Sequence, residues 1–150
     1  MATTGVPNQL YQGTDAPDLV GGAFANHTHE VAYEYYKSRS PSPICCIKLD
    51  EKTSFISLAY HMDGEIAANS SIHANAIIPF DSGLSTPYFS GVGSIEYLFS
   101  GQPDSKPHLT PCRVVCEAGG GQIMVDATGD VAEDNVSIQR LFVCGMLFQV

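Results

Sequence analysis

The chain has 150 residues, the usual length of one domain, and 44% of them are apolar. Its formal net charge is −9, from 16 acidic and 7 basic side chains, and the basic residues are scattered. Nucleic acids and anionic membrane surfaces bind clustered Lys and Arg, so the composition argues against both partners. Only 15% of the residues are charged, which leaves a neutral-polar exterior suited to large protein contacts.

The first part of the sequence differs from the rest. Residues 1–23 are rich in Gly, Pro, Asn, Gln, Thr and Asp and hold few large apolar side chains. Such a segment buries too little apolar surface to order itself, so we expect a flexible arm over residues 1–23 and a single β-sandwich domain over residues 24–150. The N-terminus lacks the pattern of a signal peptide, and no stretch is apolar enough to span a membrane. We therefore expect no secretion by a signal peptide.

Beyond the arm, short runs of alternating apolar and polar residues predict half-buried strands. Turn signals separate these runs at Asp63-Gly64, at the triple glycine 119–121 and at Thr128-Gly129-Asp130. Turn signals about every 8–12 residues predict an all-β fold, an antiparallel sandwich or a jelly-roll-like barrel of about 8–10 short strands. The strands are expected at residues 31–36, 44–49, 54–61, 72–80, 88–91, 94–100, 113–117, 122–127 and 136–150.

The last ten residues, Leu141–Val150, are almost wholly apolar and contain no charge. A chain end usually frays in water. An end as apolar as this one predicts a strand buried inside a sheet or covered by a neighbouring subunit.

The five cysteines all lie in apolar, strand-like runs. Cys45 and Cys46 are adjacent, so in a strand they point to opposite faces and do not share one site. Cys112 and Cys116 lack a second Cys/His pair at zinc-finger spacing. The pattern predicts reduced, buried thiols that act as small apolar side chains.

One cluster of residues suits a metal. In an extended strand His27 and His29 point to the same face, and Glu34 follows closely, a donor set that fits a divalent cation with open positions. The spacing resembles the first motif of the cupin family, which implies a jelly roll that binds metal through these three residues. Two features depart from that family: Pro41 stands where it has Gly, and its second motif is absent. These residues therefore indicate either a cupin-like metal-binding protein or enzyme, or a stretch of solvated surface without a metal.

A second alternative is a glycan-binding β-sandwich, because Tyr88 near Asp81 would offer an aromatic platform beside a carboxylate. Signatures of catalysis are missing. No G-x-S-x-G elbow occurs, and the triple glycine lacks the Lys-Ser/Thr of a phosphate-binding loop. We expect a protein that is not an enzyme and holds no cofactor.

The arm, the neutral-polar composition and the apolar chain end together favour an assembly protein. In this organisation the chain resembles the small decoration, or cement, proteins of tailed-phage capsids. The resemblance implies a homo-oligomer, with a trimer favoured, that sits on a major capsid protein or another protein lattice in a virion assembled in the host cytoplasm. It also implies that apolar residues of the arm grip the partner, namely Val6, Leu10, Tyr11, Leu19 and Val20.

Overall fold

The computed structural model describes residues 34–102 and 106–150, and this part of the chain is all-β. The predicted fold class is confirmed, with eight strands that all pair antiparallel. No helix in the described part is long and apolar enough to cross a membrane. The strands are β1 (Tyr35–Ser38), β2 (Ile44–Asp50), β3 (Thr53–Ile66), β4 (Ser70–Ile78), β5 (Tyr88–Phe99), β6 (His108–Gly119), β7 (Gln122–Ala132) and β8 (Val136–Phe148).

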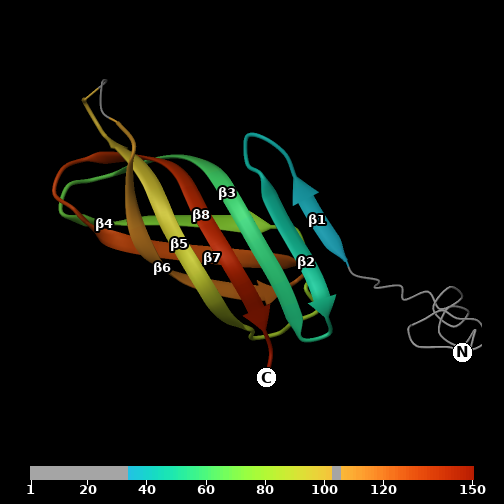
Figure 1. Ribbon diagram of the computed structural model, residues 1–150. Coiled ribbons are helices and arrows are strands. Elements are labelled where there is room, and N and C mark those ends of the chain that lie inside the picture. The colour runs from blue at the N-terminus through green and yellow to red at the C-terminus, as the bar shows by residue number, and fades with distance from the viewer. Residues whose placement is uncertain (1–33, 103–105) are drawn as a thin grey trace, which may run out of the picture. The chain divides into compact units, whose positions relative to one another are not determined.

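The strands form one curled sheet, a half-barrel, in the order β1-β2-β3-β8-β5-β6-β7-β4. Strand β6 makes the curl, because its first residues, His108–Cys112, pair with β5 and its later residues, Arg113–Gly119, pair with β7. Figure 1 shows β7 and β4 crossing behind the layer formed by β1, β2, β3, β8 and β5. The two parts of the sheet thus face each other across one apolar core.

The core follows from the alternation of side chains along each strand. In β4, every second residue from Ile72 to Ile78 is buried, as the sequence predicts. The same period of two holds in β3 and β7, because successive side chains of a strand point to opposite faces. The largest fully buried side chains are Ile56, Ile72, Ile78, Ile95, Ile123, Ile138, Leu141 and Leu147.

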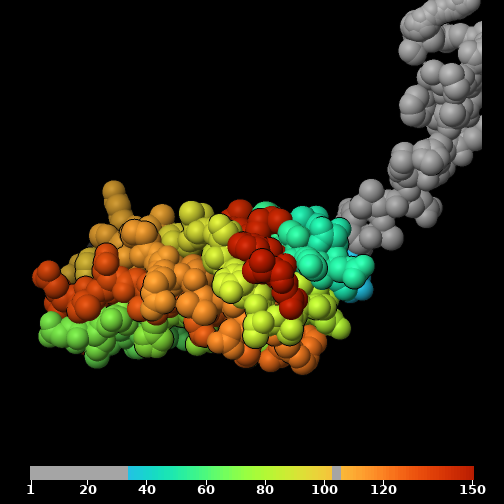
Figure 2. Space-filling model, turned by 90° about the horizontal axis from the view of Figure 1, so that it is seen from below, coloured from blue at the N-terminus to red at the C-terminus, as the bar shows by residue number. Residues whose placement is uncertain are grey.

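The apolar chain end forms a central strand, as predicted. Strand β8 lies between β3 and β5 and pairs with both along most of its length. After it, the backbone N–H of Gln149 donates a 2.9 Å hydrogen bond to the Lys52 carbonyl. The backbone N–H of Ser85 donates a 3.3 Å hydrogen bond to Oε1 of the Gln149 side chain. Figure 2, seen from this end, shows the C-terminal residues (red) at the surface beside the early strands (cyan).

Two predicted turns are wrong. Asp63-Gly64 lies within β3, and Thr128-Gly129-Asp130 lies within β7. In each case the pairing register shifts beside these residues. They therefore form a β-bulge, and the strand continues beyond it. The chain instead turns at residues 67–69, where Asn69 has a φ of 64°.

Two expected strands, residues 88–91 and 94–100, form one continuous strand, β5. The glycines between them do not break it, because the whole strand pairs with β8. At Gly93 an added Cβ would meet the side chains of Val114 and Cys112, so this glycine lets β5 and β6 approach closely at the curl. The expected turn at the triple glycine is confirmed, and Gly120 and Gly121 both have positive φ.

Candidate functional site

The outer face of the sheet on β1, β2, β3, β8 and β5 is apolar, although it faces away from the core. The members of this face follow from the pairing between strands, because residues directly opposite each other on neighbouring strands point to the same side of the sheet. At its centre Ser57 of β3 pairs with Cys144 of β8, which pairs in turn with Val92 of β5. We call this surface the outer face, and it consists of Tyr35, Lys37, Cys45, Ile47, Thr53, Phe55, Ser57, Ala59, Tyr88, Ser90, Val92, Ser94, Phe142, Cys144, Met146 and Phe148.

Only one charged side chain, Lys37, belongs to the outer face, and it lies on the edge strand β1. Several of the apolar members are strongly exposed: Val92 has 73% of its surface open to solvent, Tyr88 59% and Tyr35 49%. A sheet with one face on its core normally carries polar residues on the other. The outer face departs from that rule over five adjacent strands.

The opposite side of the molecule follows the rule. Strands β6, β7 and β4 also turn one face outward, and paired positions there carry Arg113, Glu117 and Asp126. Apolar residues on that side, such as Val115 and Ile77, stand among these charges and among His73, Asn75 and Thr128. The contrast between the two sides within one sheet marks the outer face as the unusual surface.

An ion pair borders the outer face at one end. Arg140 Nε lies 2.8 Å from Glu96 Oε1, and these two residues are paired across β8 and β5. The Arg140 guanidinium also lies 5.8 Å from the centre of the Phe142 ring, within range of a cation–π interaction. The charges at this border therefore neutralise each other and add no net charge to the outer face.

Two shallow depressions lie on the outer face, and Phe142 contributes to the lining of both. One, of about 410 Å³, is lined by outer-face residues of β3, β5 and β8, including Ser57, Val92 and Cys144. The other, of about 340 Å³, lies over β2 and β3 and is lined by residues that include Cys45 and Ala59. Ser57, Leu58 and Phe142 line both, so the two hollows adjoin each other.

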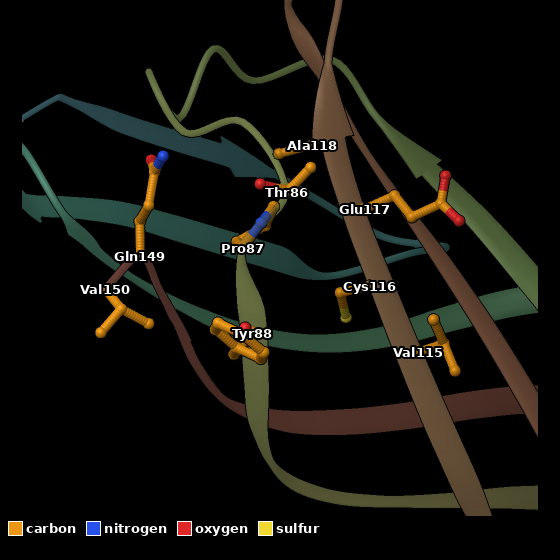
Figure 3. Close-up of a pocket in the computed structure, with 9 residues that line it drawn as sticks. All are labelled: Thr86, Pro87, Tyr88, Val115, Cys116, Glu117, Ala118, Gln149 and Val150. Carbon is orange, nitrogen blue, oxygen red and sulfur yellow. The ribbon is translucent and has the colours of Figure 1, made fainter.

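A larger cavity of about 630 Å³ lies where β5 and β6 diverge. Figure 3 shows it between the β6 ribbon, which carries Cys116 and Ala118, and the segment with Pro87 and Tyr88, with Val150 at its margin. Among the nine lining residues only Glu117 is charged, and none is a histidine. Burial, and secondarily the charge of Asp126, raises the pKa of the Cys116 thiol to about 12, so this thiol stays protonated at neutral pH and is a poor nucleophile.

The described part of the chain holds no cluster of three or more His, Cys, Asp or Glu side chains that could bind a metal ion. Of the predicted metal ligands, His27 and His29 lie outside the described residues. Glu34 is described, and its carboxylate lies 3.7 Å from Lys48 Nζ with 64% of the side chain exposed. The partner-binding residues predicted in the arm, Val6, Leu10, Tyr11, Leu19 and Val20, also lie outside the described part.

The cysteines behave as predicted in part. Cys46 is fully buried while its neighbour Cys45 lies on the outer face, which confirms their opposite directions. The prediction that all five are buried is wrong for Cys144, which is exposed at the centre of the outer face. All cysteines among the described residues are free thiols.

The outer face as a surface was missed by sequence reasoning, although one signal for it is present. Along β8, the odd-numbered and the even-numbered residues from Leu141 to Phe148 are both apolar, so both faces of this strand are apolar. Which residues of other strands lie beside it depends on the strand order and the register, which the sequence alone does not supply. Comparison with models of protein families, with curated proteins and with solved structures gives no match for this chain.

Proposed function

We propose that this protein is a structural component of a protein assembly and that the outer face is the surface by which it associates. The observation that carries the proposal is the contrast between the two outward sides of one sheet. Residues from five adjacent strands form an apolar area with Lys37 as its one charge, whereas the side formed by β6, β7 and β4 carries Arg113, Glu117 and Asp126.

Physical reasoning supports association at this surface. Contiguous apolar area in water is unfavourable by about 25 cal/mol per Å², and large patches of this kind are typical of interfaces. The area is rigid, because its residues stand on hydrogen-bonded strands, of which only β1 is at an edge of the sheet. A rigid surface loses little conformational entropy when a partner covers it.

In its most specific form, the proposal is that the protein decorates a viral shell. This form comes from the resemblance to capsid decoration proteins, which rests on the composition of residues 1–23 and on the sparse charge of the chain. The role is mechanical in either form: apolar area is buried between subunits, and the chain does not act as an enzyme.

The test compares two charge-introducing variants of the full chain. The first, Val92→Lys with Phe148→Lys, places two cations on the outer face. The matched control, Val131→Lys with Ile77→Lys, places two cations at exposed positions of β7 and β4. Sedimentation velocity from about 1 to about 100 µM should show association of the wild type and the control, and a monomer for the outer-face variant.

Far-UV circular dichroism should show the same β-sheet spectrum for the control and the outer-face variant, because all four positions are exposed. The proposal would be contradicted if the wild type and the outer-face variant sedimented alike. It would also be contradicted if the control lost association while the outer-face variant kept it.

A further inference from the structure

We infer that the partner of the outer face is a second copy of this chain, docked face to face about a two-fold axis. This inference rests on the proposed function and names the partner for the same surface. Two-fold association joins one patch to itself, so the patch must hold both a projection and a matching recess.

The outer face holds both. Tyr35 and Tyr88 stand out near two of its margins, with 49% and 59% of their surfaces exposed. Between them lie the hollows of about 410 Å³ and about 340 Å³. A second copy turned by half a turn therefore meets these hollows with its own projecting side chains.

The extent of the outer face agrees with the area that a stable dimer needs. It covers five strands spaced ~4.8 Å apart and, along β3, the seven residues Thr53–Ala59 at ~3.4 Å each, a flat outline of roughly 500–600 Å². The relief of the side chains enlarges this outline toward the ~800 Å² per partner of standard interfaces.

Charge selects the outer face as the surface along which two copies meet. The chain carries a net charge of −9, so two copies repel each other over most of their surfaces. The outer face is the exception, because Lys37 is its one charged member and the nearby Glu96 is neutralised by Arg140. Two copies approach with least repulsion along this surface.

A trimer would make a different contact. In a ring of three, each copy joins one patch to a second, different patch. The described surface has one apolar area of this size, and the opposite side carries charges such as Glu117 and Asp126. The two-fold arrangement uses the one area for both copies.

The exposed thiol of Cys144 lies at the centre of the outer face and provides the test. In the full chain with Cys45→Ser, a short bismaleimide should link two copies through Cys144. The matched control carries Cys144→Ser with Val131→Cys, which moves the reactive thiol to an exposed position on β7, and should not be linked. Peptide mapping identifies the linked cysteines.

Sedimentation equilibrium of the unmodified chain should give two copies, and Val92→Lys should weaken the dimer at least tenfold without a change in the far-UV circular dichroism spectrum. Phe142→Ala should weaken it similarly, and Val92→Lys keeps the test valid if Phe142→Ala fails to fold. A mass of three or more copies that still depends on Val92 would overturn the two-fold arrangement and leave the proposed function standing. A monomer in which Cys144 resists maleimide would show that the chain covers its own outer face and would overturn the inference.

Discussion

Gly91 of β5 and Gly145 of β8 lie directly opposite each other in the sheet, and the ring of Phe89 covers both. A Cβ added to Gly145 would lie 2.5 Å from the Ser90 carbonyl oxygen and 2.8 Å from Cζ of Phe89. The aromatic ring thus occupies the space that two side chains would fill. This arrangement lets the half-buried Phe89 pack on the core side of the central strand pair.

The glycine pair gives the first prediction, that Gly145→Ala lowers the free energy of unfolding by about 2 kcal/mol or more, because the new methyl group meets backbone and not only a flexible side chain. Urea denaturation measures the change. Gly64→Ala is the matched control, since Gly64 also lies in a strand but an added Cβ there has nothing within 4 Å. Equal effects of the two substitutions would show that steric crowding at Gly145 is not the cause.

Much of the fold could be predicted from local pattern. Alternation placed the buried residues of β4, and the uninterrupted apolar run from Leu141 indicated a strand inside the sheet. Turn-forming residues predicted a turn wrongly where the strand forms a bulge and continues, as at Asp63-Gly64. A bulge depends on the partner strand, and the partner strand depends on the fold, so local sequence does not separate a bulge from a turn.

The outer face was less predictable than the strands. Its members, such as Phe55, Val92 and Met146, come from strands far apart in sequence and meet only through the strand order and the register. Val31, Tyr33 and Tyr35 fall on one side of the alternating run 31–36, which predicts that Tyr35 faces the core, yet Tyr35 is 49% exposed. A shift of one residue exchanges the two faces of a strand, so a short edge strand is easily assigned to the wrong face.

Asn69 gives the second prediction. It lies in the turn between β3 and β4 with a φ of 64°, and its backbone N–H donates a 2.6 Å hydrogen bond to the Ala132 carbonyl. Asn tolerates this left-handed conformation, whereas Ala is disfavoured there by about 1 kcal/mol. Asn69→Ala should lower the free energy of unfolding by that amount in urea denaturation, and Asn69→Gly should leave it within about 0.5 kcal/mol. A loss as large for Gly as for Ala would point to the Asn side chain instead of the backbone.

Ser54 gives the third prediction. Its side chain is fully buried in β3, and its hydroxyl has no hydrogen-bond partner among the described residues. A buried hydroxyl without a partner costs about 1–3 kcal/mol, so Ser54→Ala should raise the free energy of unfolding by about 1 kcal/mol. Ser57→Ala, three residues along the same strand and on the half-buried outer face, should change it by less than about 0.5 kcal/mol. A destabilised Ser54→Ala variant would indicate that the hydroxyl is satisfied in solution.

The fourth prediction concerns pH and the two thiols of the core. Burial raises the pKa of both Cys46 and Cys116 from 9.0 to about 12. Smaller contributions come from the neighbouring thiols at Cys46 and from the charge of Asp126 at Cys116. In the unfolded chain these thiols lose their protons above pH 9, while in the folded protein they keep them up to about pH 12. The folded state therefore binds more protons in this range, and the free energy of unfolding falls as the pH rises from 9 toward 12.

Each thiol contributes at most about 1.4 kcal/mol per pH unit to this fall, and urea midpoints from about pH 8 to about pH 11 measure it. The double variant Cys46→Ala with Cys116→Ala should be less stable at neutral pH, because it leaves space in the core, but its stability should fall less steeply with pH. The other ionisable side chains are the same in both proteins, so the difference between the two slopes isolates the thiols. Equal slopes would mean that Cys46 and Cys116 ionise as readily in the folded protein as in the unfolded chain, which is incompatible with their burial between the two parts of the sheet.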